Sequence, residues 1–147
     1  MKKLLTIIAL AGVMSFGSST LFGQAAKYLN IGGLGTGLYA SIEFPVSSTI
    51  TIAPQFSTDY NFNKFVISGK GNFYFDEIFV VGSEWDVYAG VNFGWRLESN
   101  NDGSNNDGVS WGAQIGGRWF WSDKWGINAE FGGGSGVLGG VGVTMKM

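Results

Sequence analysis

Apolar and polar residues alternate one by one along the stretch from Trp85 to Leu97. Every odd position is apolar. The even positions hold Asp86, Tyr88, Gly90, Asn92, Gly94 and Arg96. A period of two predicts a β-strand whose two faces meet different surroundings.

The same alternation recurs along the chain and predicts eight strands. Their expected ranges are Tyr28–Gly35, Leu38–Phe44, Thr49–Tyr60, Phe65–Phe75, Trp85–Leu97, Val109–Trp121, Trp125–Gly133 and Val137–Met147. Pro54 lacks a ladder donor, so we expect a bulge or irregular pairing in the third strand.

The apolar face is too bulky for the inside of a small barrel. It carries several indoles, whereas an eight-stranded interior has room only for ordinary side chains. The other face is rich in glycine and holds the long charged residues Lys70, Arg96 and Arg118. Turning that face outward would cost roughly 2–4 kcal/mol for each cation near mid-bilayer. The pattern therefore predicts an all-β fold, an eight-stranded antiparallel up-and-down transmembrane β-barrel with lipid outside and a narrow polar lumen.

The first residues have the layout of a secretory signal peptide. Lys2 and Lys3 precede the apolar run from Leu4 to Met14, and small residues follow. The run is shorter than the roughly 20 residues of a membrane-spanning helix. We expect residues 1–24 to be a cleaved signal peptide, with cleavage uncertain by about three residues, and residues 25–147 to form the barrel.

The lengths of the connections between strands predict which end of the barrel faces the periplasm. Short turns, of which Ser122-Asp123-Lys124 is the clearest, are expected on the periplasmic side, and longer loops outside. Counting outward from Asp123 places Trp119 opposite Ile127. Indoles beside these connections predict aromatic girdles at the two membrane interfaces. The residues are Trp85, Trp121 and Trp125 at one interface and Trp95 and Trp111 at the other.

Charged residues on the polar face are candidates for a network that fills the lumen. They are Glu43, Lys70, Asp86, Arg96, Arg118 and Glu130, with Lys146 near the end of the last strand. The turn at Asp123 sets Arg118 opposite Asn128 and diagonal to Glu130, so removing Glu130 is expected to leave Arg118 or Lys70 unpaired. Buried charges need partners, which favours a sealed interior over a narrow ion path.

The chain has no His and no Cys. It therefore lacks the commonest general base, and we expect neither an enzyme nor a metal or cofactor site. No basic stripe suggests nucleic-acid binding. The stretch from Glu98 to Gly108 is acidic, but it lacks the Gly and Glu positions of a calcium loop. A solvated loop is the better interpretation, with weak cation binding as the alternative.

Three segments resemble a known family. They are Leu38–Pro45, Trp85–Gly94 and Ile115–Gly126. The chain is similar to small outer-membrane proteins of the porin-family barrel domain common in Bacteroidetes, akin to OmpA- and OmpX-type eight-stranded barrels. The resemblance implies the outer membrane of a Gram-negative bacterium. The implied partners are its lipid and, during biogenesis, periplasmic chaperones and the barrel-assembly machinery.

The sequence thus predicts a non-enzymatic outer-membrane barrel with a structural or surface-interaction role through its extracellular loops. Two alternatives stay open. One is a narrow porin-like channel for small solutes or ions, and the other is a secreted soluble barrel that binds a ligand.

Overall fold

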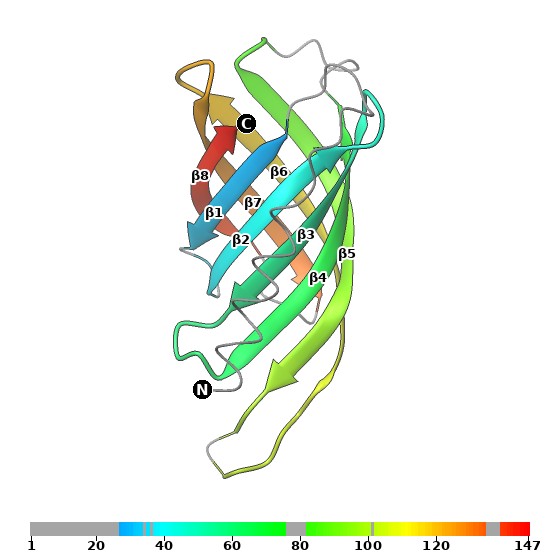
Figure 1. Cartoon of the computed structure of the whole chain (residues 1–147), viewed down its shortest axis with the longest axis vertical. Coiled ribbons are helices and arrows are strands. Elements are labelled where there is room, and N and C mark those ends of the chain that lie inside the picture. Colours follow the sequence, from blue (N-terminus) through cyan, green and yellow to red (C-terminus); the bar gives the residue numbers. More distant parts are fainter. Residues whose placement is uncertain (1–26, 34, 36, 76–81, 101, 135–138) are drawn as a thin grey trace.

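The computed structural model describes residues 27–147 except 34, 36, 76–81, 101 and 135–138 (Figure 1). The predicted signal peptide, residues 1–24, lies outside the described residues. Eight strands form one closed barrel in sequence order, each pairing antiparallel with its neighbours. The strands are β1 (Tyr28–Gly33), β2 (Leu38–Pro45), β3 (Ile50–Thr58), β4 (Lys64–Tyr74), β5 (Trp85–Glu98), β6 (Gly108–Phe120), β7 (Trp125–Gly134) and β8 (Gly140–Lys146). The predicted up-and-down barrel is confirmed. No helix in the described part is long and apolar enough to cross a membrane.

The strand ends differ from the predicted ones where turn chemistry intervenes. β3 stops at Thr58 because the Asp59 carboxylate accepts the amides of Asn63 (2.8 Å) and Lys64 (2.9 Å) and closes a tight loop. β8 begins at Gly140, after Gly139 with a φ of 73°. Its predicted start at Val137 lies outside the described residues. The third strand contains no bulge. The β2–β3 pairing keeps one register on both sides of Pro54, and the ladder is only interrupted there.

The predicted faces are confirmed along most of the barrel. On β5, Tyr88 is fully buried, whereas Phe93 is 67% exposed. Among the described residues, polar and charged side chains form most of the buried set, and most of the large apolar side chains outside it are exposed. Two expectations were wrong at strand ends. Thr58 is buried rather than outward, and Lys146 is exposed at the end of β8 rather than inside.

Following the paired residues once around the barrel shows how the strands are staggered. The row runs through Asp86, Arg118, Asn128, Gly142, Gly32, Tyr39, Ser57, Val66 and Arg96. It returns to β5 ten residues beyond its start. The strands must therefore tilt, by about 35–45° in barrels of this kind. Side chains far apart in the chain consequently meet inside.

We call the end of the barrel where β1 ends at Gly33 and β5 ends at Glu98 the loop end. The opposite end, where β1 begins at Tyr28 and β8 ends at Lys146, is the turn end. The barrel is uneven at its loop end. β5 has 14 residues, whereas β1 has 6 and β8 has 7. Figure 1 shows β1 stopping well short of the tip of β5, so the wall is tall on one side and low on the other.

Candidate functional site

The interior is organised around Arg118, whose side chain is completely buried. Its guanidinium lies over the rings of Tyr28 and Tyr88, with centroids 4.6 and 4.7 Å away, and beside Tyr74 at 5.6 Å. The same group donates to the Glu43 carboxylate and to the Tyr74 hydroxyl. A planar cation suits this cage because it stacks on aromatic faces and also forms directed hydrogen bonds.

The Glu43 carboxylate is surrounded by donors. Besides Arg118, it accepts hydrogen bonds from the hydroxyls of Thr51 and Tyr74. The amides of Asn30 and Asn72 lie 3.4 Å from its oxygens. An ionised carboxylate can accept about four hydrogen bonds, so this group is satisfied without water.

A second ion pair lies nearer the middle of the barrel. The Lys70 ammonium donates to both oxygens of Glu130, at 2.6 and 2.8 Å, and the Tyr88 hydroxyl donates to the same carboxylate at 2.7 Å. Glu130 is therefore the partner of Lys70, not of Arg118. The diagonal position of Glu130 on the β6–β7 hairpin had made Arg118 an expected partner as well. Arg118 instead reaches across the lumen to Glu43 on β2.

Two buried tyrosines reach their partners by lying across glycines. Tyr88 on β5 passes over Gly116 on β6 to Glu130 on β7, and a Cβ at Gly116 would lie 2.6 Å from the Tyr88 ring. Tyr39 on β2 passes over Gly32 on β1, and its hydroxyl donates to Asn128 on β7. The glycine-rich polar face predicted a narrow lumen but not this role for the glycines. The only signal for it was tyrosine and glycine sharing one face of neighbouring strands.

A polar relay closes the seam between the first and last strands. Asn128 on β7 donates to the Thr144 hydroxyl on β8 (2.7 Å), which donates to the Asn30 side chain on β1 (2.8 Å). The Asn30 amide in turn donates to Ser41 on β2 at 3.3 Å. All four residues of this relay are buried, and the relay was not foreseen from the sequence.

Two of the predicted lumen charges lie at the margins of this network. Asp86 is partly exposed near the turn end, 3.7 Å from Arg118. Arg96 lies near the loop end, with its Nε 3.3 Å from Glu98. The network therefore unites Glu43, Lys70, Arg118 and Glu130, while Arg96 takes a separate, more exposed partner.

All five girdle candidates are exposed on the outer wall. Trp85, Trp121 and Trp125 lie at the turn end, where Trp85 also contacts Trp119 with ring centroids 6.3 Å apart. Trp95 and Trp111 lie towards the loop end and are cross-strand neighbours of Val109 and Phe93. Their contact with headgroups stays a prediction.

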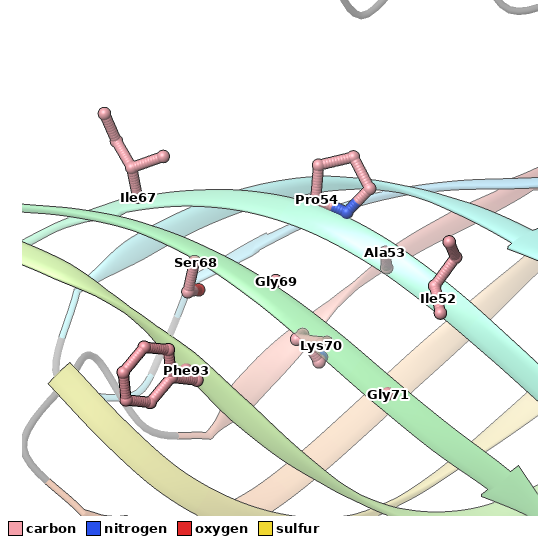
Figure 2. Close-up of a pocket in the computed structure, with 9 residues that line it drawn as sticks. All are labelled: Ile52, Ala53, Pro54, Ile67, Ser68, Gly69, Lys70, Gly71 and Phe93. Atoms are coloured by element: carbon pink, nitrogen blue, oxygen red, sulfur yellow. The ribbon is translucent and has the colours of Figure 1, made fainter.

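A hollow of about 590 Å³ lies on the outer wall (Figure 2). Gly69 and Gly71 on β4 form its floor. The side chains of Ile52, Pro54, Ile67 and Phe93 stand around it. Binding sites usually combine apolar walls with a few converging polar groups, and this hollow has hardly any. It is not a candidate active site.

The loop between β5 and β6 is folded on itself. The Asp102 carboxylate accepts the Ser104 amide at 3.0 Å and its hydroxyl at 2.6 Å, and Asp107 accepts the Glu98 amide at 3.1 Å. No group of three or more His, Cys, Asp or Glu among the described residues is arranged to hold a metal ion.

The fold is similar to that of known membrane barrels. The N-terminal β-barrel domain of Pseudomonas aeruginosa OprF superposes with a TM-score of 0.65 at 12% identity, covering 83% of this chain and 96% of that one. A structure from the de novo design of transmembrane β-barrels superposes with a TM-score of 0.56 at 14% identity, covering 83% and 93%. No protein-family model matches the sequence. No curated protein matches it either. At these identities the likeness establishes the fold alone.

Proposed function

We propose that this protein is a non-enzymatic outer-membrane barrel whose polar interior is sealed and whose loop end faces the outside of the cell. One observation carries the proposal: the distribution of side chains is inverted relative to a water-soluble protein. The completely buried side chains include Arg118 and Glu43, while Phe93, Trp111 and Phe131 are 67, 63 and 71% exposed. Such an exterior suits acyl chains and would aggregate in water.

The proposed role is structural or in surface interaction. The two ion pairs, Arg118 with Glu43 and Lys70 with Glu130, join opposite walls and fill the lumen, which argues against free passage. The β5–β6 hairpin continues beyond the barrel wall through the Ser99–Asn105 bridge and presents polar residues at its tip. The Gram-negative outer membrane, the exported precursor, the assembly partners and the kinship with porin-family barrels of Bacteroidetes belong to this proposal.

The membrane assignment is tested by quenching of tryptophan emission in reconstituted protein. All six indoles are more than one third exposed on the outer wall, so lipids brominated on their chains are expected to quench the unmodified protein. Unquenched emission, together with solubility in the absence of detergent, would favour a secreted soluble barrel.

A narrow channel is the second candidate, favoured by a lumen that is polar along its length. Planar-bilayer recording separates the two functions. A sealed interior predicts no stable conductance steps, whereas reproducible steps from the refolded protein would establish a pore.

The outward direction of the loop end is tested with epitope insertions. A tag after Gly103, in the β5–β6 loop, is expected to bind antibody on intact cells. The same tag after Asp123, in the β6–β7 turn, is expected to bind only after the cells are opened. The reverse pattern would invert the proposed orientation.

A further inference from the structure

Two exposed aromatic side chains lie in the short loop between β3 and β4. Tyr60 is 50% exposed and Phe62 is 58% exposed, and they alternate with the exposed residues Asn61 and Asn63. The loop projects past the start of β2 at the loop end of the barrel (Figure 1). Neither ring fills the lumen, and neither is one of the five indoles of the predicted girdles. The fold as described so far gives this aromatic pair no role.

The loop is held in one conformation by Asp59. Its carbonyl oxygen accepts the Phe62 amide at 3.2 Å, and its carboxylate accepts the amides of Asn63 and Lys64. Phe62 has a φ of 57°, in the left-handed region that Gly or Asn adopts at lower cost than a bulky residue. An aromatic residue at this position therefore strains the backbone and also exposes an apolar ring. Strain of this kind is often kept at contact sites, where binding offsets its cost.

Tyr60 lies against the outer wall. A Cβ at Gly33, the last residue of β1, would lie 3.5 Å from the Tyr60 hydroxyl and 3.0 Å from the side chain of Leu38. Gly33 shares the outward face of β1 with the exposed Ile31, and Leu38 is exposed at the start of β2. The Tyr60 hydroxyl is therefore beside the outer face of β1 and β2 rather than above the lumen.

The pairing of the strands gives the height of this place. With a ten-residue stagger over eight strands, a row of paired residues rises by about 3 Å at each strand, and each residue along a strand adds about 2.5 Å. Leu38 shares a row with Leu97, three strands further on, so it lies about 9 Å below Leu97 and about 4 Å below Trp95. The outward residues of β1 and β2 near this level, Ile31 and Leu38, are aliphatic. Tyr60 thus adds an aromatic ring near the level of Trp95, on the low side of the wall.

We propose that Tyr60 and Phe62 form an aromatic anchor that binds the headgroup and glycerol layer of the lipid leaflet at the loop end. Aromatic rings with a polar group suit this layer because one part is apolar and the other wet. The exposed amides of Asn61 and Asn63 can bond to headgroups and water. The anchor continues the loop-end girdle over β1 and β2, and transfer of the Phe62 ring out of water offsets its backbone strain. The inference rests on the proposed membrane insertion, but not on the side of the membrane that the loop end faces.

The test uses the depth of a spin label. The chain has no Cys, so Asn61→Cys allows a nitroxide to be attached between the two rings while both are kept. In reconstituted protein, collisions with oxygen, which enters hydrocarbon, are compared with collisions with a nickel complex that stays in water. Phe93→Cys on the outer wall and Asn105→Cys in the exposed β5–β6 loop give the two reference values. The label at Asn61 is expected to lie between them.

The two ways of failing are distinguishable. A label at Asn61 that is as accessible to nickel as the label at Asn105 would overturn the anchor, provided that the label at Phe93 reports hydrocarbon. A label at Phe93 that reports water would instead overturn membrane insertion itself, and the anchor with it.

Loss of the rings on the labelled background tests their part. Phe62→Asn keeps a residue that tolerates the left-handed region, and Tyr60→Ser removes the second ring. Together they are expected to shift the label at Asn61 towards the aqueous value. Val46→Ser, which removes an exposed apolar side chain from the β2–β3 turn at the other end, is the control and is expected to leave the label unchanged. An unmoved label in the double variant would overturn the proposal. If that variant does not refold, the depth of the label beside the intact rings still decides.

Discussion

The ring of Tyr88 packs against Gly116, so that its hydroxyl reaches Glu130 on the next strand. Because Gly116 has no side chain, the aromatic ring of Tyr88 fits beside its backbone. This fit explains why a barrel with a crowded interior carries glycine on the lumen face of β6.

Gly116→Ala is expected to destabilise the folded barrel by about 1–3 kcal/mol, because the new methyl group must displace the Tyr88 ring and weaken its bond to Glu130. Urea unfolding of the refolded protein in lipid vesicles measures the effect. Gly117→Ala is the control, since a Cβ there would meet only the Asp86 carbonyl oxygen, at 3.4 Å. Equal stability of the two variants would contradict the proposed fit.

Glu130→Ala is expected to cost about 3–5 kcal/mol, because it leaves the Lys70 ammonium buried without its counterion. Replacing both residues with Lys70→Met and Glu130→Leu should restore much of the stability, as apolar pairs often replace buried ion pairs without loss. Heat-dependent mobility of the folded band on a gel reports each variant. A double variant as unstable as the single one would show that Lys70 is not the residue left unpaired.

Arg118→Lys is expected to destabilise the barrel by about 2 kcal/mol or more, although the charge is kept. An ammonium cannot donate to Glu43 and Tyr74 in the same fixed geometry, and it stacks less well on Tyr28 and Tyr88. Unfolding by guanidinium provides the measurement. Wild-type stability in this variant would mean that charge alone, not the planar shape of the cation, holds the cage together.

The Ser104 hydroxyl and amide hold the pKa of Asp102 below its ordinary value. A lowered pKa means that these hydrogen bonds favour the ionised carboxylate and are lost as the pH falls through that pKa. Carbon-detected NMR titration of the carboxyl is expected to show this low value, and Ser104→Ala is expected to raise it towards normal. An unchanged titration in the variant would remove the hydroxyl as the main cause.

The alternation of apolar and polar residues was sufficient to predict the eight strands and their faces. It also predicted the pairing of Trp119 with Ile127, because a hairpin register depends only on the turn beside it. The ion pair between Arg118 and Glu43 could not be predicted from the alternation or from a hairpin register. Glu43 lies on a strand that does not adjoin β6, and the two meet only because the tilted strands close into a barrel with a ten-residue stagger. The end of β3 was set by the Asp59 turn, which does not alter the alternation.

The relay from Asn128 through Thr144 to Asn30 has a consequence for how the molecule forms. Thr144 and Asn30 are 114 residues apart in the chain, so the contact between them cannot arise early from local structure. Contacts of such high sequence separation slow folding. Before β8 pairs, Thr144 cannot join Asn30 on β1 to Asn128 on β7. These two side chains would then need hydrogen bonds from water or from a chaperone. Closure of the barrel, in which β8 pairs with β1, is therefore expected to come late in folding.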